Sequence, residues 1–146
     1  MAVLFYLSAQ CDDGSVRLTG GPNKFEGRVE LCLDRNWGQV CAMGWTGLDA
    51  KVVCRQLGHS TDNRKLMAIS SGGTQIIILF LIIAQAVLNY VYGGEAVPGR
   101  VNNVRCTGDE EQLVDCGLTM LTNLNSCTPA GVVCRGQKIK LLAMKV

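Results

Sequence analysis

The sequence predicts a single α+β domain in which disulfide bonds hold short strands and one helix together. The chain has 146 residues, which is enough for one domain and short for two. Several segments alternate between apolar and polar residues, as half-buried strands do, and one segment has helical spacing. Eight cysteines are many for a cytosolic protein and are typical of an extracellular, oxidised one.

The first ten residues have features of a secretory signal. An apolar run from Ala2 to Leu7 precedes the small residues Ser8 and Ala9, although no basic residue begins it. We interpret residues 1–10 as a short or truncated signal peptide. The alternative is an irregular N-terminal arm.

The residues after Cys11 predict antiparallel strands. A first strand is expected around Val16–Leu18, and the composition of residues 20–23 indicates a turn. Residues 26–33 alternate, so we expect a strand with one covered face that carries Val29, Leu31 and Leu33. Residues 34–36 then turn the chain into a second strand, which completes a hairpin.

Residues 37–58 predict a strand followed by a helix. The strand begins at Trp37 and ends at Cys41. Thr46 is a candidate N-cap, and Asp49 has the spacing of a capping box. Gly58 is a natural helix terminator. One helical face can be shared by three apolar residues, which are Leu48, Val52 and Leu57.

The rest of the chain predicts short elements. Residues 99–106 resemble a strand, and residues 107–116 a loop with a helical turn that Thr107 and Glu110 could cap. Residues 118–127 are polar and rich in turn formers, and residues 131–134 resemble a closing strand. The tail 136–146 is weakly amphipathic, and we expect a frayed end rather than a membrane-binding helix.

Five motifs, in order along the chain, carry a family resemblance. They are Gly27-Arg28-Val29-Glu30, Trp37-Gly38-x-Val40-Cys41, Asp49-Ala50-x-Val52-Val53-Cys54-Arg55-Gln56-Leu57-Gly58, Val104-x-Cys106 and Ala130-Gly131-Val132-x-Cys134. Together they resemble a scavenger receptor cysteine-rich domain. The resemblance implies a curved antiparallel sheet that cradles the 46–57 helix, over residues 11–135.

Residues 64–83 have no counterpart in the family pattern. They form an insertion of about twenty residues, and structureless additions of this length are normally functional or disordered. The apolar run from Ile76 reaches Leu88 at about 13 residues, whereas a membrane span needs about 20. The run is β-branched and uncharged, as aggregation-prone strands are. We weigh a lineage-specific loop against the translation of an unspliced intron.

The resemblance also implies how the cysteines pair, which their spacing alone does not. Carried over by position, it pairs Cys41 with Cys127, Cys54 with Cys134, and Cys106 with Cys116. Cys11 and Cys32 lie outside this core on neighbouring segments, and we expect them to bond to each other. Where an eight-cysteine branch of the family places a further bridge, this chain has Phe25 and His59.

Composition and motifs weigh against catalysis and against metal binding. His59 is the single histidine, no serine lies in a nucleophile-elbow motif, and no close C-x-x-C pair suggests zinc. Many members of the resembled family hold a divalent cation with two acidic residues that directly follow the Cys41 position. This chain has Ala42 and Met43 there, and we expect neither a metal nor another cofactor.

The resemblance implies an extracellular module that binds polyanions, microbial surfaces or partner proteins. We expect it to be secreted or on the outer face of the plasma membrane, attached only through other parts of a larger receptor. A net charge of +2 is too small to predict nucleic-acid binding. Met43 and Trp45 could form an exposed apolar patch, although Trp45 suits the core better. The candidate ligand contacts are Arg28, Arg35, Arg100 and Arg105.

Two rival hypotheses remain from the sequence. One is a non-functional, truncated or read-through product of a gene with several such modules. The other is a small secreted enzyme, for which the sequence offers no pair of nucleophile and base.

Overall fold

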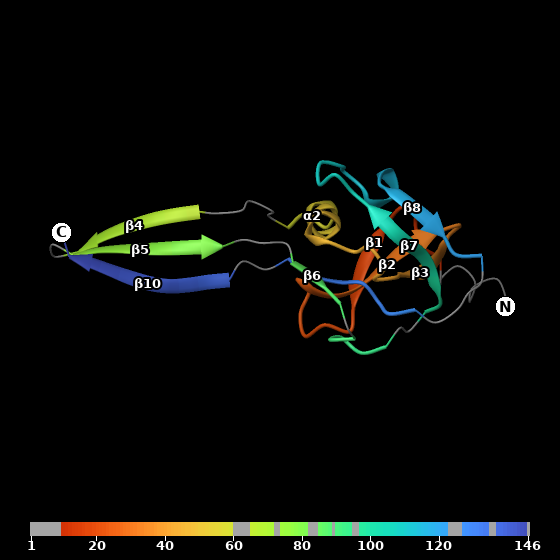
Figure 1. Cartoon of the computed structure of the whole chain (residues 1–146), viewed down its shortest axis with the longest axis horizontal. Helices are drawn as coiled ribbons and strands as arrows, with labels where there is room; N and C mark the ends of the chain where they lie inside the picture. The colour runs from red at the N-terminus through yellow and green to blue at the C-terminus, as the bar shows by residue number, and fades with distance from the viewer. Residues whose placement is uncertain are drawn as a thin grey trace.

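A computed structural model describes residues 10–59, 65–71, 74–81, 85–88, 90–94, 97–122, 127–134 and 137–145 (Figure 1). The signal peptide expected at residues 1–10 lies outside these ranges except for its last residue. In chain order the elements are β1 (Val16–Thr19), β2 (Glu26–Leu33), β3 (Asn36–Val40), α2 (Gly47–Gln56), β4 (Lys65–Ser71), β5 (Thr74–Leu81), β6 (Gln85–Val87), β7 (Gly99–Arg105), the 3₁₀ turn η1 (Leu113–Asp115), β8 (Gly117–Met120), β9 (Gly131–Val133) and β10 (Gln137–Lys145).

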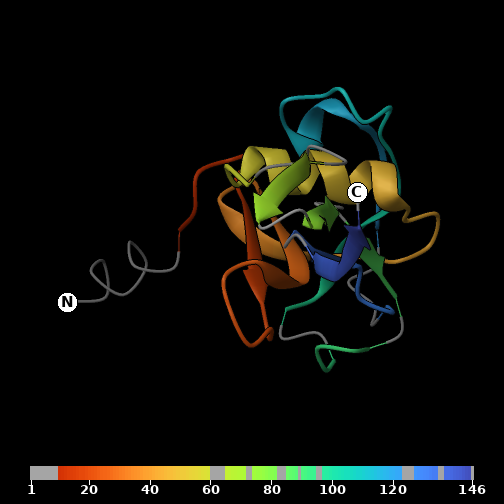
Figure 2. The ribbon, with the colours of Figure 1, turned by 90° about the vertical axis from the view of Figure 1, so that its left-hand side faces the viewer.

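Most strands form one curled sheet with the order β6-β9-β2-β3-β7-β8, and β1 pairs with β2 at the side. The predicted hairpin is present, with β2 antiparallel to β3. The sheet is mixed rather than wholly antiparallel, because β3 and β7 run parallel. Parallel neighbours need a long crossover connection, and here the chain between them includes α2. Figure 2 shows α2 lying across the strands.

Helix α2 has the predicted ends. The Thr46 side chain accepts a hydrogen bond at the first turn, and the Asp49 carboxylate accepts one from the Thr46 backbone N–H, which completes a capping box. At the other end Gly58 has a φ of +82°, and the N–H of His59 donates to the carbonyl of Cys54. This is a Schellman termination, for which a glycine is favoured.

The buried face of α2 differs from the predicted one at Leu48, whereas Val52 is buried and Leu57 packs against the core as predicted. Leu48 is 50% exposed, whereas Asp49 is 1% exposed. The inversion has a physical cause, because the second oxygen of Asp49 accepts a hydrogen bond of 2.8 Å from the backbone N–H of Cys106. The carboxylate therefore joins the helix start to the end of β7. The apolar packing of α2 comes from Ala50, Val52, Val53 and Cys54.

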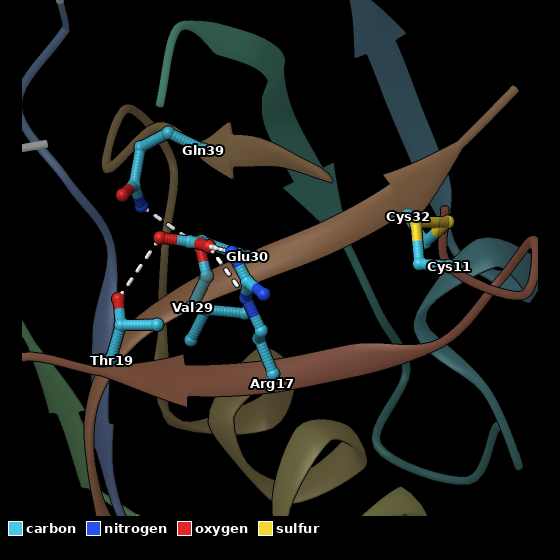
Figure 3. Close-up of polar contacts among 7 residues, drawn as sticks. All are labelled: Cys11, Arg17, Thr19, Val29, Glu30, Cys32 and Gln39. Carbon is cyan, nitrogen blue, oxygen red and sulfur yellow. Dashed lines mark hydrogen bonds and ion pairs between the residues drawn. A yellow bond between two sulfur atoms is a disulfide. The ribbon is translucent and has the colours of Figure 1, made fainter. Parts of the chain in front are cut away.

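Strand β2 is covered on both faces, and not on one as its alternation predicted. Val29 and Leu31 lie in the core, but Glu30 between them is also fully buried. Its carboxylate pairs with Arg17 at 2.6 Å and accepts a hydrogen bond from the Thr19 hydroxyl at 3.0 Å (Figure 3). A buried charge is tolerated when it is paired and hydrogen-bonded, and this network meets both conditions.

Four disulfides are present, which are the three that the family resemblance implies and the Cys11–Cys32 bond expected outside that core. Cys41–Cys127 and Cys54–Cys134 span 86 and 80 residues, and they tie β3 and α2 to the C-terminal part of the sheet. Cys106–Cys116 closes a local loop, and Cys11–Cys32 fixes the N-terminal segment to β2 (Figure 3). Their sulfurs lie among the core side chains or beside them.

A second sheet with the order β10-β5-β4 extends away from the curled sheet (Figure 1). Two predictions are corrected here. The 64–83 segment is not structureless, because β4 and β5 pair as an antiparallel hairpin. The tail is not frayed, because Gln137–Lys145 pairs with β5. The insertion is rich in β-branched residues, which favour strands. The tail pairs with the edge of β5 that β4 leaves free.

Among the described residues, no helix is both long enough and apolar enough to cross a bilayer.

Candidate functional site

An open groove of about 430 Å³ lies beside the Cys41–Cys127 disulfide. It is built from the end of β3, the residue after β6, the middle of β7 and the segment after residue 126. Its lining residues are Cys41, Ala42, Met43, Leu88, Asn102, Cys127 and Thr128. Apolar side chains therefore make most of its wall, and no acidic side chain of the described residues contributes.

Backbone hydrogen bonds hold the groove in place. The N–H of Cys41 donates to the carbonyl of Val101 at 2.8 Å, and the N–H of Ala42 donates to the carbonyl of Thr128 at 2.8 Å. These bonds join three segments that are distant in sequence. Met43 extends from this framework into solvent and is 65% exposed.

Trp45, two residues after Met43, is anchored in the core. It is 4% exposed, and its indole N–H donates to the carbonyl of Gly131 at 2.9 Å. The expectation that Trp45 anchors the core, rather than forming a patch with Met43, is confirmed.

The side-chain amide of Asn102, in the groove wall, is only partly hydrogen-bonded. Its amide nitrogen makes one long contact, 3.7 Å from the sulfur of Met43, and its amide oxygen is buried with no hydrogen-bond partner among the described residues. Buried polar atoms without a partner are rare in folded proteins.

A small recess of about 10 Å³ adjoins the groove, with Leu88 lining both. Arg28 of β2 is among its lining residues and is 9% exposed. One of its terminal nitrogens donates to the carbonyl of Tyr92, whereas its Nε is buried without a partner among the described residues. No carboxylate in the described ranges forms an ion pair with Arg28.

The loop over Arg28 is itself fixed by Tyr92. The Tyr92 hydroxyl donates to a carboxylate oxygen of Glu26 at 2.9 Å. Burial, followed by this hydrogen bond and the charge of Glu26, raises the pKa of the Tyr92 phenol. The phenol therefore stays protonated and keeps donating. Glu26 is thereby engaged by Tyr92 and also by the Asn23 amide at 3.0 Å.

The structure does not gather the four predicted arginines into one patch. Arg28 is buried, and Arg100 lies near the β2–β3 turn that holds Arg35, with its guanidinium 3.6 Å from Asp34. Arg105 is exposed at the other end of β7, about 16 Å along the strand from Arg100. Arg28 lies away from the open surface because β2 is covered on both faces, and its role as a ligand contact stays a prediction.

Other chemistry-bearing groups are already engaged. The eight cysteines are all in disulfides, and the His59 ring lies against Phe25. The carboxylate of Glu110 comes close to the sulfurs of Cys106 and Cys116, but those sulfurs are bonded to each other. Glu110 instead accepts hydrogen bonds from the backbone of residues 107–109. Those bonds, chiefly from Thr107, lower the pKa of Glu110 to about 2.

Sequence reasoning missed Leu88, Asn102 and Thr128 as groove residues. Leu88 lies at the end of the apolar run that begins in the insertion. Asn102 lies in an expected strand, and Thr128 lies between two cysteines. No local pattern marks them, because only the sheet topology brings them together.

Comparisons with known proteins agree on one family. The sequence model described as "Scavenger receptor cysteine-rich domain" matches residues 19–135. A protein of Patiria pectinifera, described as a scavenger receptor cysteine-rich domain superfamily protein, is 36% identical over 88% of this chain and 10% of its own length. Galectin-3-binding protein of Rattus norvegicus is 33% identical over 84% of this chain and 18% of its own length. The chain thus spans a small part of these curated relatives.

Two solved structures have the same fold. The third SRCR domain of murine neurotrypsin matches with a TM-score of 0.62 and 34% identity, over 82% of this chain and 94% of that domain. The dimeric form of the SRCR domain of mouse MARCO matches with a TM-score of 0.54 and 30% identity, over the same 82% and 94%.

Proposed function

The chain belongs to the scavenger receptor cysteine-rich family, and from that premise we propose that it is an extracellular module that binds a partner protein through the groove beside Cys41–Cys127. Extracellular placement is supported by the disulfide-rich core, since such bonds persist in oxidising compartments. A protein-type partner is supported by the relatives, one of which is named for binding galectin-3 and another of which is described as dimeric.

The observation that carries the proposal is the side-chain content of the groove. At the two positions where the resemblance implies an acidic pair that holds a cation, this chain has Ala42 and Met43. Both line the groove together with Leu88. A hard cation needs several oxygen ligands at one point, which these side chains do not offer. Exposed apolar groups on a rigid framework favour contact with apolar side chains of another protein.

A polyanion is a weaker match to the described surface than a protein. Polyanion binding rests on several cations that act together, as in forked contacts with sulfate or phosphate groups. Arg28 is buried, and Arg100 is partly neutralised by Asp34. Arg105 lies at the other end of β7 from Arg100. We therefore place the arginines outside the principal contact and propose the apolar groove instead.

Binding, and not catalysis, is the proposed activity. In the described part of the chain the His59 ring packs against Phe25 and the cysteines are in disulfides, so no free thiol faces an imidazole there. The resemblance supports the same proposal.

The test is a binding screen with matched variants. The purified domain, displayed as a tetramer, is applied to an array of secreted proteins and cell-surface ectodomains from the organism that encodes the chain. Met43→Asp places a charge in the groove, and Leu48→Asp places one on the exposed side of α2 as the control. We expect a partner whose binding is lost with Met43→Asp, kept with Leu48→Asp and unchanged by EDTA. Binding that survives Met43→Asp, or that EDTA abolishes, would exclude the groove.

A further inference from the structure

We propose that the groove and the adjoining recess together recognise an extended peptide segment that carries an apolar side chain and, one or two residues away, a carboxylate. The inference rests on the proposed function and deepens it by stating the chemistry of the partner. The apolar side chain would occupy the groove at Met43 and Leu88, and the carboxylate would reach Arg28.

The recess supplies the reason for a carboxylate. Arg28 is a buried cation that forms no ion pair among the described residues, and its Nε has no hydrogen-bond partner there. Leaving a buried charge unpaired is costly, so an incoming anion gains more at this atom than at a solvated arginine. The nearest candidate within the chain, Glu26, is held by Tyr92 and Asn23 instead.

The size of the recess limits what can enter it. About 10 Å³ has room for one water-sized group, so a single oxygen of an anionic group enters and the rest of that group stays outside. A single oxygen at Nε, with the rest of the carboxylate at the mouth, is a charge-assisted hydrogen bond. An acidic peptide side chain satisfies this geometry.

The groove supplies the reason for an extended peptide beside that carboxylate. The buried amide oxygen of Asn102 is an acceptor without a donor among the described residues. A peptide N–H that passes the groove wall would satisfy it, and a lipid tail or an aromatic ring would not. Leu88 borders both cavities, so one extended segment would reach both, with its apolar and acidic residues at i and i+2, about 7 Å apart.

The test is an NMR titration of the isotope-labelled chain with two blocked heptapeptides. The probe is acetyl-Gly-Gly-Leu-Gly-Asp-Gly-Gly-amide, and its matched control has Asn in place of Asp. We expect the Asp peptide to shift the backbone amides of Leu88 and Thr128 and the Nε–H signal of Arg28. The Asn peptide should shift the groove amides alone and bind about tenfold more weakly, because it lacks the charged contact.

The outcomes separate the two proposals. Equal affinities, with no response of the Arg28 Nε–H, would overturn the carboxylate contact but leave the groove as a binding site. No shift of groove amides with either peptide at millimolar concentration would overturn both. Asn102→Ala leaves Arg28 in place and should weaken both peptides by a similar factor. An unchanged affinity in that variant would overturn the backbone contact.

Discussion

The rings of Phe25 and His59 lie against each other, with centroids 5.0 Å apart and planes inclined at 52°. These are the positions at which an eight-cysteine branch of the family, by the resemblance, places a further bridge. Phe25 precedes β2, and His59 directly follows the glycine that ends α2. An aromatic contact therefore joins the sheet to the end of the helix where a covalent bond would otherwise do so.

Replacing the pair by cysteines should create a fifth disulfide. A loop of this length contributes about 3.8 kcal/mol on the chain-entropy model, and the lost ring contact subtracts about 1 kcal/mol. We expect Phe25→Cys with His59→Cys to raise Tm by about 5–10 °C. Non-reducing peptide mapping and thermal unfolding check this. The double serine variant is the control and should unfold at a lower temperature than the parent, and two free thiols in the cysteine variant would contradict the prediction.

The two long-range disulfides should be needed for secretion. Removing Cys54–Cys134, which spans 80 residues, costs about 4.5 kcal/mol, against a typical domain stability of about 5–15 kcal/mol. We expect the double alanine variant to be retained in the cell. The matched variant without Cys106–Cys116, which spans 10 residues, should lose about 2.7 kcal/mol and still be secreted. Western blots of medium and lysate compare them, and equal secretion of all forms would refute the ranking.

Trp45→Phe should destabilise the domain more than Trp37→Phe. The first change leaves the buried carbonyl of Gly131 without its donor, which costs about 1–3 kcal/mol. Trp37 is half-buried and contacts the Arg17 guanidinium at 4.2 Å, a cation–π contact worth about 0.5–1 kcal/mol. Urea unfolding measures both, and a larger loss in Trp37→Phe would contradict the assigned roles.

Glu110 should make stability depend on acid pH. Its pKa is lowered from an ordinary 4.5 to about 2, chiefly by the backbone hydrogen bond from Thr107. A lowered folded-state pKa gives stabilisation that is present above about 4.5 and lost as pH falls toward about 2. We expect Tm of the parent to fall more steeply across this window than Tm of Glu110→Gln. Parallel pH profiles would show that the carboxylate is not held in this way.

The domain should fold without the second sheet. Strands β4, β5 and β10 pair with one another, apart from the curled sheet that carries the groove (Figure 1). We expect a chain that lacks residues 64–83 and 137–146 to keep its four disulfides, its secretion and its Tm within a few degrees. A chain that lacks only 64–83 is the companion variant. If the double deletion misfolds and the 64–83 deletion does not, the tail supports the domain.

Sequencing of the transcript across residues 63–84 tests the intron hypothesis.

The sequence by itself determined the local structure. Thr46 and Asp49 define the start of α2, Gly58 its end, and alternation defines the hairpin of β2 and β3. These signals depend on neighbouring residues, whose side chains reach backbone groups within one turn or one strand pair. The family motifs added three of the cysteine pairs, which spacing alone leaves open, and Cys11 and Cys32 were the remaining two.

Only the tertiary structure decided which polar groups are buried and which residues form the groove. Arg28 and Glu30 alternate with apolar neighbours and so indicate a solvated face, yet other segments cover them. Met43, Leu88 and Asn102 meet because β7 runs parallel to β3 and because β6, which Leu88 follows, pairs with β9. Such contacts join residues that are far apart in the chain. Their free energy depends on which other segments cover each side chain in the folded sheet, and no local pattern encodes this.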